Sequence, residues 1–314
     1  VVFRGEDGKA KCLSNTCTHR GGSLSGGKIK GNCIQCPYHG WEFDEEGCVN
    51  RIPSLGPNPK IPSRTRIDAY PVDEKHGLVF AFLGDLSESE RPPIIDVREW
   101  EQEGWTSTLQ TYQVTGNYER SIENGIDPAH NEYVHDTHGF SGEDTEYSIG
   151  DMRIEERDKW GQGFWHTFQA PPLPDEAKFA DARKDAGDLE AGTGYHGPTQ
   201  VWTYIHMSKT DWMHQYLIER PIDENTIQIY LLCMRNCYTD SKFDENVKER
   251  NQYVADQDKV VIEDLRPVLT PDTNTKEFML PADKCILLYR ESLKEWEANG
   301  WRIDQEAVDA AKNR

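Results

Sequence analysis

The stretch "CTHRGGSLSGGKIKGNCIQCPYHGW", residues 17–41, decides the fold because it concentrates three Cys and two His in 25 positions. It contains C-x-H at Cys17 and His19, and C-x-x-H at Cys36 and His39. Two thiolates and two imidazoles can hold a tetrahedral zinc ion, or a [2Fe–2S] cluster in which two His bind one iron. A structural zinc site more usually pairs C-x-x-C with H-x-x-x-H, so one Cys and one His in each motif favour the cluster.

Small and rigid residues surround these four side chains. Gly21, Gly22, Pro37 and Gly40 would let two tight loops fold around a cluster. We interpret the remaining cysteines as non-ligands, with Cys12, Cys33 and Cys48 as small strand residues and Cys233, Cys237 and Cys285 as core or pocket-wall residues.

The composition of the whole chain limits the possible functions. Its 314 residues suggest two domains, and nine Trp, thirteen Tyr and ten Phe indicate a folded core. The net charge of −20 argues against a nucleic-acid partner, because binding phosphates needs a basic surface. No apolar run approaches the roughly 20 residues of a membrane span, so we expect no membrane insertion.

The cysteine usage bears on the cellular compartment, and the first residues bear on where the chain starts. Clustered Cys without a secretory signal favour metal chemistry in the cytoplasm over disulfides. The chain begins with Val and its first residues already look like a strand. We therefore expect that the complete protein has further N-terminal residues.

The first part of the chain, residues 1–90, is rich in Gly, Pro and short alternating apolar stretches. This pattern predicts a small all-β domain. Its longest apolar run, "GLVFAFLG" at 77–84, is typical of a buried strand. The polar segment "DLSESERPPI" at 85–94 predicts a linker.

The sequence pattern of the second part, residues 91–314, predicts an α+β domain with an antiparallel sheet flanked by helices. Strands are expected at 201–207, 212–218 and 229–234, and helices at 243–265 and 285–300. The glycines of 187–198 lack the setting of a nucleotide-binding turn, which indicates a loop. The polar insertion at 168–197 would cap a pocket entrance or form a surface loop.

A second group of ligand-type residues lies in "NYERSIENGIDPAHNEYVHDTHGF", residues 117–140. Asp127, His130 and His135 form D-x-x-H-x-x-x-x-H. A spacing of five turns one His about 140° from the other on an ideal helix, so a shared metal needs a helix distortion or a helix end. Asp127 and Pro128 suit a helix start as N-cap and first residue. On spacing alone, metal ligands and ordinary polar residues both remain open.

The first motif resembles the Rieske signature in C-T-H-R-G and C-P-Y-H-G-W. With "GLVFAFLGD" and "ENGIDPAHNEYVH", the likeness to Rieske non-heme iron oxygenases of the aromatic-ring-hydroxylating type extends over nearly the whole chain. The resemblance implies that Cys17 and Cys36 bind one iron of a [2Fe–2S] cluster and that His19 and His39 bind the other. Ligation by two His raises the reduction potential of such a cluster.

The same resemblance implies a mononuclear Fe(II) held by two His and one carboxylate, with positions open for O₂ and water. His130 and His135 would be the imidazole ligands. The carboxylate comes from a downstream helix, where "DQDKVVIEDL" offers Asp258, with Asp256 and Asp264 as alternatives.

The resemblance also assigns a catalytic role to Asp127. It would link the metals across a subunit boundary by bonding His130 and the partner's His39, supported by Glu123 and Asn124. We expect His138 to have a nearby polar role instead of a ligand role.

The implied function is a terminal oxygenase component that hydroxylates or oxidatively demethylates an aromatic or other cyclic small molecule with O₂. The chain shows no flavin or nicotinamide motif, so a separate reductase, with or without a ferredoxin, would supply electrons. The resemblance implies a homotrimer, and a β subunit remains open. Side chains alternate along the strand at 201–207, where Trp202, Tyr204 and His206 are candidate substrate-binding residues.

Two alternative functions keep only part of this interpretation. A Rieske-type electron-transfer protein would contain the cluster and lack the second iron. A zinc-stabilised binding module would contain neither cluster nor mononuclear iron.

Overall fold

A computed structural model describes residues 1–57, 59–136, 141–149, 152–169, 188–271 and 277–300. The chain divides into two compact units, an N-terminal unit Val1–Ile94 and a C-terminal unit Ile95–Arg314. Among the described residues, no helix combines the length and the apolar character that a membrane span requires.

The N-terminal unit is all-β, as the sequence predicts, and its strands are short because turn residues interrupt them. Leu13, Leu24 and Phe43 lie at the centre of its core, each at most 1% exposed. The first sheet contains β1 Val2–Arg4, β2 Ala10–Leu13 and β7 Ala69–Tyr70, the second contains β3 Lys28–Lys30, β4 Cys33–Gln35, β5 Glu42–Phe43 and β6 Val49–Arg51, and β8 Val72–Lys75 pairs with β9 Leu78–Ala81. The unit also contains the short 3-10 helices η1 Leu24–Gly26, η2 Pro53–Leu55 and η3 Glu88–Glu90.

The apolar run at 77–84 forms a strand, β9, but it is not buried as predicted. Val79 is 39% exposed and Leu83 is 68% exposed. The reason is that β9 pairs only with β8, in a sheet of two strands. An apolar run of this length therefore indicates a strand and leaves its burial undecided.

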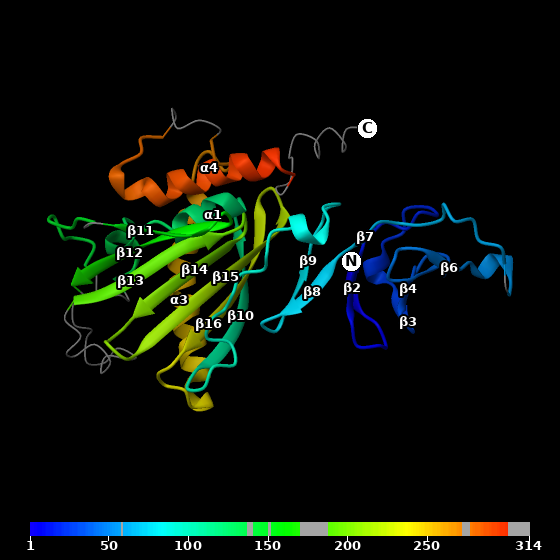
Figure 1. Ribbon diagram of the computed structural model, residues 1–314, viewed down its shortest axis with the longest axis horizontal. Coiled ribbons are helices and arrows are strands. Elements are labelled where there is room, and N and C mark those ends of the chain that lie inside the picture. Colours follow the sequence, from blue (N-terminus) through cyan, green and yellow to red (C-terminus); the bar gives the residue numbers. More distant parts are fainter. Residues whose placement is uncertain (58, 137–140, 150–151, 170–187, 272–276, 301–314) are drawn as a thin grey trace. The chain divides into compact units, whose positions relative to one another are not determined.

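The C-terminal unit is built on a seven-stranded antiparallel sheet, ordered β10-β16-β15-β14-β13-β12-β11 (Figure 1). The strands predicted at 201–207, 212–218 and 229–234 are confirmed as β14, β15 and β16. The strand bounds are β10 Thr106–Thr115, β11 Arg153–Asp158, β12 Gly161–Gln169, β13 Asp188–His196, β14 Gln200–His206, β15 Trp212–Asp223 and β16 Thr226–Arg235.

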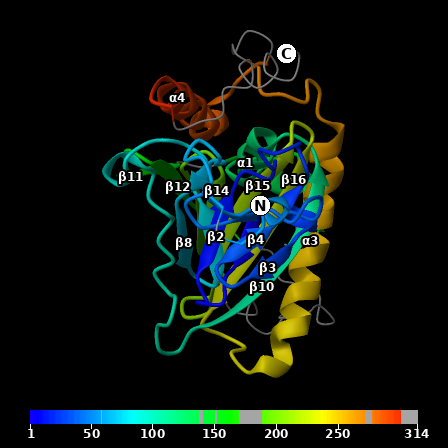
Figure 2. The ribbon, with the colours of Figure 1, turned by 90° about the vertical axis from the view of Figure 1, so that its right-hand side faces the viewer.

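In the described part of the chain, four α-helices accompany this sheet: α1 Tyr118–Gly125, α2 Asn131–Val134, α3 Asp244–Asp264 and α4 Lys284–Ala298. The predicted helices at 243–265 and 285–300 are confirmed as α3 and α4, preceded by the 3-10 helices η6 Ser241–Phe243 and η7 Pro281–Asp283. Gly300 follows α4 with φ +73°, as a helix stop requires. Figure 2 shows α3 running along the length of β10.

The prediction of a loop at 187–198 is wrong, because Asp188–His196 forms strand β13. Its glycines make room for tryptophan rings. A Cβ on Gly192 would lie 2.7 Å from the Trp165 ring, and one on Gly194 would lie 2.5 Å from the Trp202 ring. The predicted insertion at 168–197 therefore begins and ends in the strands β12 and β13, and residues 170–187 lie outside the described part of the chain.

Candidate metal centres

The two loops that carry the first motif repeat one backbone pattern. In each loop the N–H of the cysteine donates to the carbonyl five residues later, and the glycine four residues later donates back to the cysteine carbonyl. Both glycines, Gly21 and Gly40, have positive φ, at +69° and +74°. These bonds join Cys17 to Gly22 (2.9 Å), Gly21 to Cys17 (2.9 Å), Cys36 to Trp41 (2.7 Å) and Gly40 to Cys36 (3.0 Å).

The loops separate the cysteines from the histidines by depth. Cys17 and Cys36 are 3% and 2% exposed, whereas His19 and His39 are exposed. The two imidazole rings lie with their centroids 4.5 Å apart, and Trp41 stacks on the His19 ring. Burial raises the pKa of the Cys17 thiol, and the neighbouring Cys36 raises it further, although backbone N–H groups favour the thiolate.

This separation argues against a single ion at the first motif. Among the described residues, only His130, His135 and Asp258 bring three ligand atoms within 4.8 Å of one another. The two Cys and two His of the loops do not converge on one point, as a tetrahedral zinc site would require. A buried Cys pair beside an exposed His pair fits a cluster in which each kind of ligand binds its own iron.

The second candidate site forms around the short helix α2. His130 directly precedes α2 and His135 directly follows it, so the two imidazoles leave the helix at opposite ends. The predicted helix start at Asp127 is wrong, because α2 begins at Asn131. Asp127 Oδ1 instead accepts the backbone N–H of Ala129 at 2.7 Å and fixes the turn before the helix.

Asp258 on α3 completes this site. Its Oδ1 lies 3.2 Å from His135 Nε2 and 3.5 Å from His130 Nε2, and the two Nε2 atoms are 3.2 Å apart. Burial alone would raise the pKa of Asp258, but His135 and His130 hold it below its usual value. One carboxylate oxygen and two imidazole nitrogens therefore meet at a single point, which fits the ligand set of a non-heme iron.

Gln257 and Asp127 approach the two imidazoles at Nδ1, and Nε2 of each ring lies towards Asp258. Gln257 Oε1 lies 3.1 Å from His135 Nδ1 and can accept only if that nitrogen carries the proton. Asp127 Oδ2 lies 3.6 Å from His130 Nδ1. Burial opposes the protonation of His130, but the carboxylates of Asp127 and Asp258 outweigh burial and raise its pKa.

Further residues hold this site in place, and one of them was not predicted. Asn124 Nδ2 donates to Asp258 Oδ1 at 3.0 Å. Gln257 links His135 to Asp136, to which its Nε2 donates at 2.7 Å. The only signal for Gln257 in the sequence is its position next to Asp258.

The other candidates from the sequence lie apart from this point. Asp256 and Asp264 are exposed on α3, and Asp256 accepts a hydrogen bond from Gln252 at 2.9 Å. Glu123 faces a different partner and binds the buried guanidinium of Arg290 at 2.6 Å. His138 lies outside the described residues.

The three candidate substrate-binding residues lie on the sheet face opposite α1. Trp202 and Tyr204 are buried in a cluster with Ile95 and Val97, and His206 stacks on Trp212. The alternate residues of β14 face the helices instead. Val201 packs with α1, and Thr203 contacts Thr193, whose hydroxyl donates to Gly125 O at 2.7 Å.

Trp202, Tyr204 and His206 therefore lie on the face of β14 away from His130, His135 and Asp258, and their role in substrate binding stays a prediction. The candidate metal ligands follow α1 or lie on α3, and both helices cover the other face of the sheet. Alternation along a strand gives two faces, and the sequence alone does not say which one the helices cover.

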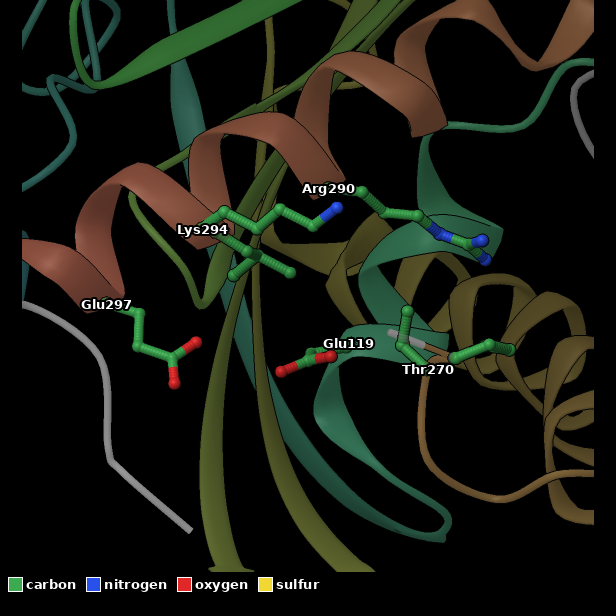
Figure 3. Close-up of a pocket in the computed structure, with 7 residues that line it drawn as sticks. Glu119, Thr270, Arg290, Lys294 and Glu297 are labelled. Carbon is green, nitrogen blue, oxygen red and sulfur yellow. The ribbon is translucent and has the colours of Figure 1, made fainter. Parts of the chain in front are cut away.

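A pocket of about 90 Å³ lies between α1, α4 and Thr270–Pro271 (Figure 3). Cationic and anionic side chains line it together, among them Glu119, Arg290 and Lys294. No candidate metal ligand contributes to its lining, so it does not extend either metal site.

Comparison with protein families gives two matches that divide the chain as the two sites do. Residues 1–71 match the Rieske [2Fe-2S] domain, and residues 114–299 match the vanillate O-demethylase oxygenase C-terminal domain. The second match alone covers more than half of the chain.

Individual relatives agree with these matches. The cholesterol 7-desaturase of Hemicentrotus pulcherrimus is 32% identical over 52% of this chain, and the match spans 36% of that protein. The iron-sulfur subunit of the toluene-4-sulfonate monooxygenase system of Comamonas testosteroni is 25% identical over 86% of this chain and 81% of its own length.

A solved structure extends the likeness to the fold. NdmA, the methylxanthine N1-demethylase of Pseudomonas putida, in its structure with caffeine, has a TM-score of 0.78 and 26% identity to this chain. The likeness covers 95% of this chain and 81% of that one. With a Rieske domain, an oxygenase C-terminal domain and one fold throughout, this chain belongs to the Rieske non-heme iron oxygenases.

Proposed function

We propose that this chain is a terminal oxygenase that uses O₂ and externally supplied electrons to hydroxylate or oxidatively demethylate an aromatic or other cyclic small molecule. The observation that carries the proposal is the convergence of His130, His135 and Asp258 in a chain that also contains the Rieske loops. An electron carrier would need no such second site.

The two metal groups of this family would be held by different parts of the chain. Cys17 and Cys36 would bind one iron of the [2Fe–2S] cluster, and the exposed His19 and His39 would bind the other. When bound at the second site, Fe(II) supplies the activation of O₂, while the protein positions substrate beside it.

The residues around the second site would keep its ligands in one geometry. Gln257 would hold the proton of His135 on Nδ1, which leaves Nε2 for the metal. Asn124 would orient the Asp258 carboxylate through its hydrogen bond. Asp127 would orient His130 and link it to His39 of the partner subunit within a homotrimer.

The electron donor would be a separate protein. A relative named as one subunit of a monooxygenase system supports this arrangement. A reductase, with or without a ferredoxin, would dock near His19 and His39, whose exposure supports electron entry there. We place the protein in the cytoplasm, where reduced nicotinamide cofactors are available to such a reductase.

Metal analysis tests this proposal directly. We expect three irons and two acid-labile sulfides per chain, with a Rieske-type EPR signal after reduction. Two irons that stay at two after Fe(II) reconstitution would identify an electron carrier. Zinc without sulfide would contradict both assignments.

Labelled O₂ distinguishes the reaction types once a substrate is known. A cis-diol retains both oxygen atoms, whereas a monohydroxylated product retains one. The Asp127→Asn variant should keep both metals and slow the reoxidation of the reduced cluster in a single turnover. Reoxidation at the unaltered rate would refute the bridging role.

A further inference from the structure

A closed ring of four charged side chains joins α1 to α4. Arg290 on α4 binds the carboxylate of Glu123 on α1 with two bonds, from Nε to Oε1 at 2.6 Å and from Nη2 to Oε2 at 2.9 Å. Arg120 Nη1 donates to the same carboxylate at 3.0 Å, and Glu277 accepts from both arginines at 2.7 Å. These bonds close what we call the charge ring, which consists of Arg120, Glu123, Arg290 and Glu277.

Most of the charge ring is buried. The side chains of Arg120, Glu123 and Arg290 are each at most 8% exposed. Two cations and two anions cancel, so the ring buries no net charge. A buried ion pair is weak evidence for stability, because well-packed apolar side chains often stabilise a fold as well or better. What the pairs add is direction, since two parallel bonds give a guanidinium and a carboxylate one relative orientation.

The charge ring also reaches the segment that follows α3. Arg120 Nη2 donates to the carbonyl oxygen of Pro267 at 3.2 Å, and Pro267 lies three residues after α3 ends at Asp264. Figure 3 shows the Arg290 side chain reaching from α4 towards α1. The ring therefore ties α1 to α4 and to the end of the helix that carries Asp258.

The residue that follows Glu123 contacts the candidate metal ligand. Asn124 Nδ2 donates to Asp258 Oδ1 at 3.0 Å. Successive residues of a helix point about 100° apart, so Glu123 and Asn124 hold different sides of α1. A side chain ends about 5–6 Å from the helix axis, so a rotation of α1 by about 10° would move the Asn124 amide by about 1 Å. Lengthening the bond by that distance would break it, because such bonds extend to only about 3.2 Å.

We propose that Glu123 and Arg290 are positioning residues, which fix the rotation of α1 through the charge ring and so hold the Asn124 amide on Asp258. The inference rests on the proposed function for the metal that Asp258 would bind. Asn124 donates to the same carboxylate oxygen that lies nearest to the two imidazoles, so its position sets how that oxygen would face the metal. Neither Glu123 nor Arg290 would touch iron or substrate.

A double-mutant cycle tests whether Arg290 acts through Asn124. Arg290→Lys keeps the charge and removes the two parallel bonds, so the fold should persist. In protein that carries the cluster, the Fe(II) affinity should fall about tenfold in Asn124→Ala and about fivefold in Arg290→Lys. In the Asn124→Ala background, Arg290→Lys should change the affinity by less than about twofold, because the amide that it positions is absent. Independent effects would instead multiply to about fiftyfold.

Leu293→Ala is the matched control on α4. Leu293 is 2% exposed and lies three residues after Arg290, outside the charge ring. Its substitution should lower the midpoint of urea unfolding at least as far as Arg290→Lys does, because it removes buried apolar contacts. The Fe(II) affinity should nevertheless stay within about twofold of the wild type.

Three results of these titrations would overturn the proposal. One is an unaltered Fe(II) affinity in Arg290→Lys, and another is a loss of about fiftyfold in the double variant. The third is an equal loss of Fe(II) affinity in Leu293→Ala and Arg290→Lys, which would mean that the affinity follows the stability of α4.

A readout without the mononuclear iron separates this proposal from the proposed function. The side-chain amide of Asn124 is observed by NMR in the full chain with its cluster oxidised, labelled with a nitrogen isotope at asparagine, and is assigned by its loss in Asn124→Ala. Arg290→Lys should shift this signal, and Leu293→Ala should leave it in place. A wild-type protein that takes up no Fe(II) at Asp258 contradicts the proposed function, whereas an unshifted amide signal in Arg290→Lys contradicts the positioning role.

Discussion

The two metal sites of this chain differ in how the protein builds them. The loops at 17–22 and 36–41 form the first site within a short stretch of sequence, and their backbone hydrogen bonds stay inside each loop. The second site joins the ends of α2 to Asp258 on α3, more than a hundred residues later. The first site is thus a property of two loops, whereas the second depends on how α1 and α3 pack on the sheet.

The sites also differ in their access to solvent. His19 and His39 are exposed, whereas His135 is 3% exposed and the Asp258 side chain 23%. An exposed imidazole pair suits electron transfer from another protein, and a sheltered site suits chemistry from which water should be excluded. The difference fits the proposed function, in which one chain would separate the uptake of electrons from their use.

Removal of one imidazole from each site gives the strongest test of this separation. His130→Ala should reduce turnover by about a thousandfold or more and keep the visible and EPR spectra of the cluster. His39→Ala should lose those spectra and still bind Fe(II) at the second site. Loss of the cluster in His130→Ala would show that the two sites do not form independently.

The next largest effect is expected for Fe(II) binding, and it tests which carboxylate of α3 is the ligand. Asp258→Ala should weaken Fe(II) binding about a hundredfold, because it removes one of three protein ligands. Asp256→Ala should change it less than about threefold, since Asp256 is exposed and accepts a hydrogen bond from Gln252. Fe(II) titration of both variants measures the two affinities. A larger loss of Fe(II) affinity in Asp256→Ala than in Asp258→Ala would make Asp256 the ligand.

These two sites were predictable from the sequence to different degrees. The cluster loops and the pair His130 and His135 follow from local spacing and from the family resemblance. The sequence offered three acids on α3, and only the packing of α3 on β10 brings Asp258 to the imidazoles.

Two features of the sheet could not be predicted from the sequence, for one common reason. The face that the helices cover decides whether Trp202 or Val201 packs against α1, and a strand of alternating residues does not encode that choice. The glycines of β13 look like a loop because the tryptophans for which they make room lie on other strands. Contacts between distant segments decided each of these cases.

The buried carboxyl group of Glu219 should make the stability of the C-terminal unit depend on pH. Burial raises the pKa of Glu219 to about 8, although Ser121 donates a hydrogen bond to it at 2.7 Å. The unfolded chain loses this proton near pH 4.5 and the folded chain near pH 8, so stability falls as the pH rises between those values.

Glu219→Gln should remove this dependence and still accept the bond from Ser121. From pH 6 to pH 7.5 the wild type should lose about 2 kcal/mol relative to the variant. Urea unfolding at both pH values measures the difference. Parallel pH profiles would show that the interior here is more hydrated than the burial of Glu219 indicates.

The smallest effect concerns the two similar loops of the cluster. Gly21 and Gly40 share a positive φ, so alanine at either position should cost about 1 kcal/mol. A Cβ on Gly40 would also lie 3.1 Å from Pro53, whereas one on Gly21 meets nothing within 4 Å. Gly40→Ala should therefore lose the cluster absorbance at a lower denaturant concentration than Gly21→Ala, and equal midpoints would contradict this difference.

The attachment of α3 to β10 at both ends limits how this protein can change during evolution. Hydrogen bonds near Lys248 and at Glu263 fix both ends of the helix that carries Asp258. One residue inserted between Lys248 and Asp258 would turn the carboxylate by about 100° and move it by about 1.5 Å. Exposed positions of the helix can accept substitutions, but a change in its length would move Asp258 away from His130 and His135.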